Sequence, residues 1–154
     1  DDFFVFDTTR DTNLVIVFPL TAQSEVVAIR QFRYGANTIV LEIPGGASKP
    51  GQNLEETLYD ELVEETGYRP GQIIPLNTKR CWFDPASMRV KYTPLLAIDC
   101  AWEKEPTPDP YEIIEVVKIP YAEWIERIKS GEVEDDKTIA ITFLVDLYLG
   151  NTYH

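Results

Sequence analysis

The sequence predicts a mixed α/β (α+β) fold, in which helices cover the faces of a β-sheet, and three observations support it. Short runs rich in Val, Ile and Phe alternate with turns along the first third of the chain. One helical segment follows these runs, and two more helical segments close the chain after a second group of strands. The 154 residues show no internal repeat or linker, so we expect one domain over residues 1–154 with a single sizeable core.

The expected strands share a β-branched and aromatic composition and are separated by turn residues. They are Phe3–Phe6, Leu14–Leu20, Val26–Phe32, Thr38–Ile43, Ile73–Leu76, Tyr92–Asp99 and Ile113–Ile119. Pro44-Gly45-Gly46 predicts a turn after the fourth of them. Three prolines within residues 105–110 predict a loop, because neither a helix nor a central strand tolerates that spacing.

Three helices are expected from their start and stop signals. They run from Asn53 to Gly67, from Tyr121 to Gly131, and from Asp135 or Asp136 to Gly150. In the first helix, Asn53 followed by Glu56 makes a variant of the capping box, and Gly67 favours a left-handed end. Apolar residues at 121, 124, 125 and 128 give the second helix one core-facing side.

Composition excludes several classes of protein. The formal charge of −12 disfavours nucleic acid as a partner, although metal ions can still mediate contact with a phosphorylated small molecule. No apolar run approaches the roughly 18 residues that a membrane span needs, so no membrane partner is expected. Cys81 and Cys100 are expected to be reduced thiols of a cytoplasmic protein. A single histidine, His154, argues against a Cys/His zinc site and against Cys–His or Ser–His catalysis.

The first residues, DDFFVFD, carry no basic leader or apolar segment of a signal peptide. Because the chain begins directly on a strand-like run, we expect that the natural protein has residues before Asp1.

An apolar stripe and an acidic cluster share the first helix. Leu54, Leu58 and Leu62 lie within about 80° of one another on a helical projection, so this stripe is expected to face the core. Glu65 points between the directions of Leu54 and Leu58, and Glu61 lies beside it. A carboxylate on such an edge has to be paired or neutralised.

The acidic cluster of Glu61, Glu64 and Glu65 is unfavourable for the helix by itself. Like charges four residues apart and anions in the last turn each cost roughly 0.2–1 kcal/mol. A hard cation such as Mg²⁺ compensates this charge and fills its remaining positions with water and substrate phosphate. The cluster therefore predicts a metal site that binds a diphosphate, with a solvated acidic surface as the alternative.

The segment from Gly46 to Tyr68 resembles the Nudix box. This resemblance implies a Nudix fold, an α/β/α sandwich with a mixed β-sheet. The family pattern is a glycine, five residues, a glutamate, seven residues, then Arg-Glu-apolar-any-Glu-Glu-any-Gly-apolar. The positions that match it in register are Gly46, Glu61, Leu62, Glu64, Glu65, Gly67 and Tyr68. Gln52 replaces the first glutamate and Asp60 the arginine, and a hydrogen bond from Gln52 to Asp60 is expected to keep a weaker brace.

Segments outside the box are similar to ADP-ribose pyrophosphatases and related nucleotide-sugar hydrolases. They are IRQFRYG at 29–35, LEIPGG at 41–46, Asp84-Pro85, EIIEVVKIP at 112–120 and GEVEDDKTIAI at 131–141. The resemblance implies that Glu61 and Glu65 bind Mg²⁺ or Mn²⁺ directly. It implies that Glu64 completes the catalytic cluster directly or through water, and that the carbonyl of Gly45 is a further ligand.

The resemblance also implies substrate and base roles. Arg33 would contact a substrate phosphate, with Arg30 as a second candidate. Glu112 would activate the attacking water, with Glu115 as its rival.

The implied activity is the metal-dependent hydrolysis of a nucleoside diphosphate sugar, ADP-ribose or another nucleotide sugar, to a nucleoside monophosphate and a sugar phosphate. A homodimer is expected by analogy. The alternative is a catalytically weak Nudix-fold sensor that binds a nucleotide sugar, with Gln52 and Asp60 marking the lost activity.

Overall fold

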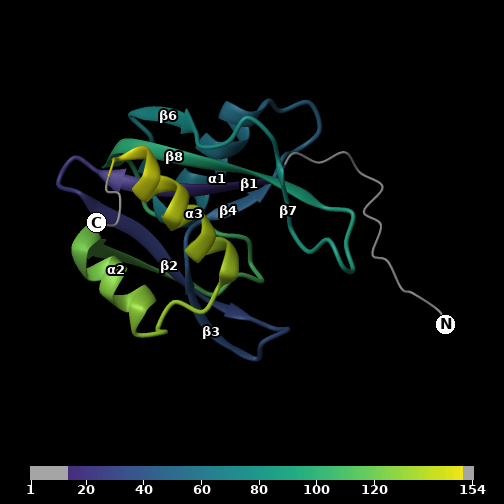
Figure 1. Ribbon diagram of the computed structural model, residues 1–154. Coiled ribbons are helices and arrows are strands. Elements are labelled where there is room, and N and C mark those ends of the chain that lie inside the picture. Colours follow the sequence, from purple (N-terminus) through teal and green to yellow (C-terminus); the bar gives the residue numbers. More distant parts are fainter. Residues whose placement is uncertain (1–13, 151–154) are drawn as a thin grey trace.

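The computed structural model describes residues 14–150, which form nine strands and three helices (Figure 1). The strands are β1 (Leu14–Thr21), β2 (Glu25–Arg33), β3 (Thr38–Glu42), β4 (Gly45–Ala47), β5 (Tyr68–Arg69), β6 (Gln72–Pro75), β7 (Cys81–Trp82), β8 (Lys91–Trp102) and β9 (Ile114–Pro120). The helices are α1 (Leu54–Thr66), α2 (Tyr121–Lys129) and α3 (Asp136–Tyr148). Every strand and helix expected within residues 14–150 is present, whereas the expected strand Phe3–Phe6 and His154 lie outside the described residues.

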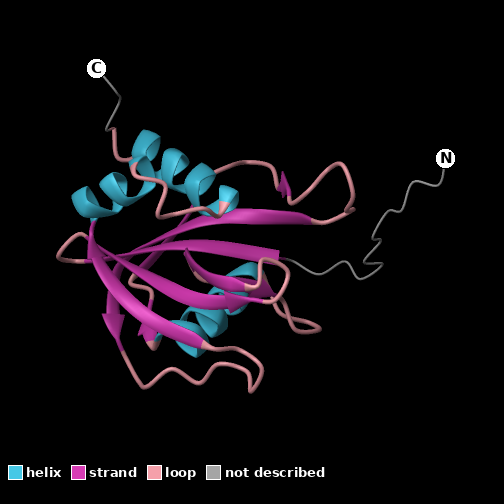
Figure 2. Ribbon diagram, turned by 90° about the horizontal axis from the view of Figure 1, so that it is seen from below, coloured by secondary structure: helices cyan, strands magenta, loops and turns pink. Residues whose placement is uncertain are grey.

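The sheet is mixed and separates two layers of helices, as the sequence predicts (Figure 2). β1 runs parallel to β8, while every other strand pair is antiparallel. β2 pairs with β1 only near their connecting turn, at Leu20 and Val26, and then pairs with β3 on one edge and β9 on the other. β4 pairs with the first residues of β1, which β2 leaves unpaired.

Alternate residues of β1 supply two cores on opposite faces of the sheet. Ile16 and Phe18 belong to the larger core, which contains Trp124 of α2 and residues of α3. Val15 and Val17 belong to the smaller core beneath α1. Both pairs are buried, so β1 is the central strand of the α/β/α sandwich.

The ends of α1 follow the sequence signals. Asn53 and Glu56 form a reciprocal capping box, and Gly67 ends the helix with a φ of 77°. Leu58 and Leu62 are fully buried as expected. The prediction for Leu54 was wrong: its side chain is exposed, because the core beneath α1 reaches the second and third turns but not the first residue of the helix.

Three short strands were not predicted, and β4 replaces an expected turn. Its two glycines pair with β1 through their backbones, an interaction that depends on a distant partner strand and not on β propensity. β5 and β7 are two-residue strands that lie along β8.

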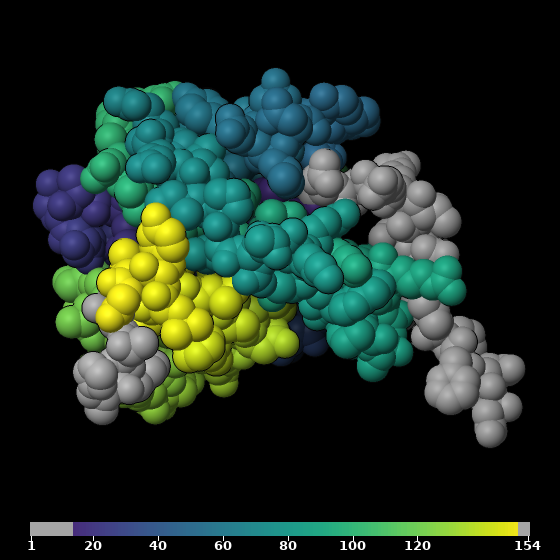
Figure 3. Space-filling model, turned by 45° about the horizontal axis from the view of Figure 1, so that its top comes forward, coloured from purple at the N-terminus to yellow at the C-terminus, as the bar shows by residue number. Residues whose placement is uncertain are grey.

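α3 is apolar on both its inner and its outer face. Ile141 and Val145 are buried in the larger core, and Asp135 caps the helix by accepting a hydrogen bond from the Thr138 N–H. Three outward residues at spacings of four, Ile139, Phe143 and Leu147, are 38%, 52% and 47% exposed. Figure 3 shows α3, in yellow, lying open at the surface.

Among residues 14–150, no helix combines the length and the apolar character that crossing a membrane requires.

Candidate metal and diphosphate site

The site is built where β4 meets the last turns of α1. The Gly45 N–H donates to the Glu65 carboxylate at 3.0 Å, and the Val17 N–H donates to the Pro44 carbonyl at 3.0 Å. Since polar groups alternate along an antiparallel ladder, both the N–H and the carbonyl of Gly45 are directed away from β1. The Gly45 carbonyl is therefore available to a ligand on the side of the strand where Glu65 lies.

Both glycines of β4 are closely surrounded. A Cβ atom on Gly45 would lie 2.5 Å from the Val15 carbonyl oxygen, a backbone atom, so no larger residue fits there without moving the strand. A Cβ atom on Gly46 would displace the carboxylate of Glu61 from its present position. Glu61 and Glu65, one helical turn apart, thus lie directly against the backbone of β4.

Glu65 is only 4% exposed. Its burial raises its pKa well above the ordinary value, and the negative charges of Glu61 and Glu112 raise it further. The Gly45 N–H and the charge of Arg33 oppose this shift without cancelling it. The folded protein therefore holds a carboxyl group whose ionised form is poorly compensated.

Burial raises the pKa of Glu61 to about 7, and the neighbouring Glu64 adds to the shift. Lys49 acts in the opposite direction, whereas Glu112 and Asp109 raise the pKa further. Within the described residues, neither Glu61 nor Glu65 forms an ion pair.

Glu64 differs from the other two glutamates in having a cationic partner, although it lies close enough to Glu61 to raise the pKa of that group. The Glu64 carboxylate pairs with the Lys49 ammonium at 2.8 Å, and the two side chains are 39% and 55% exposed. Across residues 14–150, no three His, Cys, Asp or Glu side chains lie close enough together to hold one ion. The structure therefore brings Glu61, Glu65 and Gly45 together and leaves Glu64 outside that group.

The donor set fits a hard divalent cation. Two carboxylates without an ion pair and one backbone carbonyl offer only oxygen atoms, which Mg²⁺ and Mn²⁺ prefer. Mg²⁺ is commonly held by one or two carboxylates and keeps several waters, so this small set is sufficient.

The brace predicted across the divergent box positions is present. The Gln52 side-chain amide donates to the Asp60 carboxylate at 2.6 Å, and the Lys49 N–H donates to the Gln52 side-chain oxygen at 2.8 Å. The loop before α1 is thereby tied to the helix by two successive hydrogen bonds.

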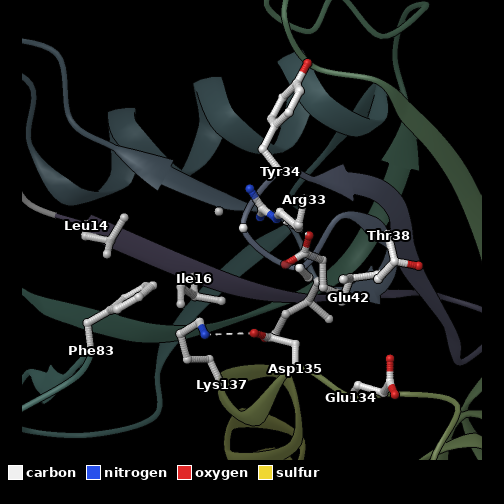
Figure 4. Close-up of a pocket in the computed structure, with 15 residues that line it drawn as sticks. Leu14, Ile16, Arg33, Tyr34, Thr38, Glu42, Phe83, Glu134, Asp135 and Lys137 are labelled. Atoms are coloured by element: carbon white, nitrogen blue, oxygen red, sulfur yellow. Dashed lines mark hydrogen bonds and ion pairs between the residues drawn. The ribbon is translucent and has the colours of Figure 1, made fainter.

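A cavity of about 610 Å³ adjoins this site and shares Gly45 with it (Figure 4). Leu14, Ile16 and Phe83 contribute apolar surface to the lining. Its charged residues are of both signs: Arg33, Lys137, Glu42, Glu134 and Asp135. Apolar surface combined with polar groups that can orient a ligand is typical of small-molecule sites.

Arg33 is anchored by Glu42. Arg33 Nε pairs with the Glu42 carboxylate at 2.6 Å, and Glu42 is nearly buried. Desolvation lowers the pKa of Arg33, but the hydrogen bond and charge of Glu42 outweigh it and leave this pKa raised. Within the described residues no hydrogen bond engages Nη1 or Nη2, so the outer edge of the guanidinium can bind an anion in the cavity.

Arg30 lies elsewhere. Side chains three positions apart on a strand point to opposite faces, and Arg30 pairs with Glu115 at 3.7 Å and with Glu132 at 3.8 Å. It does not line the cavity that contains Arg33. The structure therefore separates the two arginines that the sequence grouped as substrate contacts.

The two candidate bases are separated as well. Glu112 closes a turn with Asp109: the Asp109 N–H donates to the Glu112 carboxylate at 3.1 Å. The negative charge of Glu112 raises the pKa values of both Glu61 and Glu65. Glu115 instead pairs with Arg30 on β2.

The loop that carries Glu112 is attached to α1, since the Thr107 N–H donates to the Glu64 carbonyl at 2.8 Å. Glu112, and not Glu115, therefore belongs to the electrostatic surroundings of the glutamate pair.

Glu42 and Lys137 are among the cavity residues that sequence reasoning missed. Glu42 gave a usable signal, because a glutamate near the end of an apolar strand has to find a partner. Lys137, which pairs with Asp135 at 2.8 Å and lies over the Phe83 ring, gave none, because its place in the cavity depends on how α3 packs on the sheet.

Comparisons with known proteins identify the family of this chain. The family model of the NUDIX domain matches residues 10–140. The chain belongs to the Nudix family.

The ADP-ribose pyrophosphatase of Bacillus subtilis (strain 168) is 28% identical over 140 residues, which cover 90% of this chain and 75% of that protein. The methanol dehydrogenase activator of Bacillus methanolicus is 26% identical over 144 residues, which cover 90% of this chain and 75% of that protein. The ADP-sugar pyrophosphatase of Mus musculus is 28% identical over 118 residues, 74% of this chain and 54% of that protein. A crystal structure of an ADP compounds hydrolase superposes with a TM-score of 0.80 at 22% identity over 92% of this chain and 75% of that one, which confirms the fold.

Proposed function

We propose that this Nudix domain is a pyrophosphatase that hydrolyses a nucleoside diphosphate sugar to a nucleoside monophosphate and a sugar phosphate. The observation that carries the proposal is the pair Glu61 and Glu65, which lies against β4 beside a cavity with an anchored arginine. Neither glutamate forms an ion pair within the part of the chain that the structure describes. Relatives named ADP-ribose pyrophosphatase and ADP-sugar pyrophosphatase favour an ADP-linked sugar, and ADP-ribose is the first substrate to test.

Each residue has a defined part in this reaction. Glu61, Glu65 and the Gly45 carbonyl would hold Mg²⁺ or Mn²⁺, with Glu64 contributing through water. Such an ion neutralises phosphate charge and lowers the pKa of a bound water. The outer edge of Arg33 would bind a phosphate through two parallel hydrogen bonds.

Glu112 would act as the general base. It would accept a proton from the attacking water as the new P–O bond forms and the bridging P–O bond of the diphosphate breaks. Its loop position beside the glutamate pair supports this assignment over Glu115, which is occupied by Arg30.

A catalytically weak sensor is the second candidate. Asp60 stands where the family pattern has an arginine, and Glu64 is paired with Lys49, so the cluster is less complete than the pattern implies. A sensor would bind a nucleotide sugar in the same cavity without turning it over.

The exposed stripe of α3 supports the proposal of a homodimer, because apolar side chains aligned on one helical face are typical of an interface. Sedimentation equilibrium should give twice the chain mass, and Phe143→Glu should shift the protein toward the monomer. The charge of −12 supports the absence of a nucleic-acid partner, and the free thiols of Cys81 and Cys100 support a reducing compartment, the cytoplasm.

A substrate panel tests the proposed activity. The protein is incubated with ADP-ribose and other nucleotide sugars in Mg²⁺ or Mn²⁺, and the released nucleoside monophosphate is measured by anion-exchange chromatography. Turnover that disappears in Glu65→Gln supports the pyrophosphatase. Saturable binding without turnover supports the sensor, and the absence of both contradicts the two functions.

A further inference from the structure

Lys49 brings a positive charge to the acidic side of α1. Its ammonium lies 2.8 Å from the Glu64 carboxylate and 3.9 Å from that of Asp60. The last turn of α1 contains no basic residue of its own. The charge of Lys49 therefore comes from the loop before the helix and not from the helix itself.

The loop fixes Lys49 in front of Glu64. The Lys49 N–H donates to the Gln52 side chain at 2.8 Å, and the Gln52 N–H donates back to the Lys49 carbonyl at 3.1 Å. The Gln52 side-chain amide then binds Asp60 on α1 at 2.6 Å. The backbone of Lys49 is thus tied to the helix by the same brace that replaces the arginine and glutamate of the family pattern.

The ammonium itself remains exchangeable. The Lys49 side chain is 55% exposed, and Glu64 is 39% exposed, so water can replace either partner at little cost. Glu61 and Glu65, by contrast, lie against β4 and form no ion pair with any residue between 14 and 150. The three glutamates therefore divide into a fixed pair and a third carboxylate held by a removable cation.

We propose that Lys49 is a built-in competitor for the divalent cation: it retains Glu64 outside the fixed pair and thereby weakens metal binding. This inference rests on the proposed metal site of Glu61, Glu65 and Gly45. Lys49 is a positioning residue here, because it acts through Glu64 and not on the substrate.

Titration of Mn²⁺ into the substrate-free protein by calorimetry tests the inference. Lys49→Met should bind Mn²⁺ roughly three- to tenfold more tightly than the unchanged protein, the size of coupling seen between residues in contact. The gain should fall below about twofold in the Glu64→Gln background, because Lys49 then has no carboxylate to retain. Lys49→Arg, which keeps the charge, should stay within about twofold of the unchanged protein.

Lys129→Met is the matched control. It removes the same charge and a 2.8 Å ion pair with Glu126, on α2 across the sheet from α1. Tighter Mn²⁺ binding in this control as well would assign the effect to net charge and overturn the role of Lys49.

Two further outcomes separate the inference from the proposed function. If the unchanged protein binds Mn²⁺ and Lys49→Met binds it equally or more weakly, Lys49 only braces the loop and the inference fails while the metal site stands. If the unchanged protein binds no Mn²⁺ even with ADP-ribose present, the metal site fails and the inference with it. Thermal melting in EDTA, where Lys49→Met should remain folded with a similar midpoint, shows that the binding data come from native protein.

Discussion

Leu62 and Glu65 lie one turn apart on α1 and are almost equally buried, yet we expect them to affect stability in opposite directions. Leu62 packs into the core with Val17 of β1, and burial of such a side chain contributes roughly 1.5–3 kcal/mol. Glu65 has one N–H donor, from Gly45, and the like charge of Glu61 one turn away. The same helix face therefore carries a stabilising side chain, Leu62, and a poorly compensated carboxyl group, Glu65. This combination is typical of a functional site placed on a rigid element.

Truncating Leu62, the stabilising residue of the two, should have the largest effect on the free energy of unfolding. Leu62→Ala leaves a cavity beneath α1 and should lower the free energy of unfolding by roughly 2–5 kcal/mol. Urea denaturation followed by tryptophan fluorescence measures the change. Leu54→Ala, on the same stripe but exposed, is the control and should change stability by less than about 1 kcal/mol.

Replacing Glu65, the residue expected to destabilise the helix, should affect activity and not the fold. Glu65→Gln should lower turnover by more than about 100-fold, because a metal ligand is lost. In metal-free buffer the variant should be as stable as the unchanged protein or more stable, since a repelled charge is gone. A sharp loss of metal-free stability would instead make Glu65 a structural partner.

The contrast also predicts a pH dependence of metal-free stability. The folded-state pKa of Glu61 is raised to about 7, and that of Glu65 is also raised. Their contribution to the free energy of unfolding is therefore fully present below the unfolded pKa, near 4.5. The part due to Glu61 is lost as the pH rises through about 7, and the part due to Glu65 is lost as the pH rises through its own raised pKa. The double variant Glu61→Gln, Glu65→Gln should lose less stability between pH 5 and 8 in EDTA, as measured by thermal melting. Equal slopes for the two proteins would show that neither carboxyl is perturbed.

The smallest expected effect concerns the hydrogen bond between Gln52 and Asp60, which ties the loop before α1 to the helix. Gln52→Glu combined with Asp60→Arg restores the family pattern and should raise the rate by a few-fold, because a charged pair holds the loop more firmly than one amide hydrogen bond. Steady-state kinetics with the best substrate of the panel measures it. An unchanged rate would mean that the present brace, at 2.6 Å, already holds the loop in position.

Local signals predicted the fold well. The capping box at Asn53, the left-handed end at Gly67 and the helix start at Asp135 depend on neighbouring residues, and each is present. β4 was missed because its pairing with β1 is not local, and Leu54 was misplaced because a helical projection does not show how far a core extends.

Part of the site could also be predicted. The Gln52–Asp60 bond and the burial of Glu65 follow from spacing along one helix and its loop. Strand alternation would have separated Arg30 from Arg33. The pairing of Lys49 with Glu64 is a choice among several nearby carboxylates, which spacing does not resolve.

The most direct test of the central claim is calorimetric titration of Mn²⁺ at pH 8 into the unchanged protein and the Glu61→Gln, Glu65→Gln double variant. Saturable binding to the unchanged protein, weakened by more than about 100-fold in the double variant, is the predicted result. Equal binding to both proteins, or no binding to the unchanged protein even with ADP-ribose present, would contradict a divalent cation at this glutamate pair.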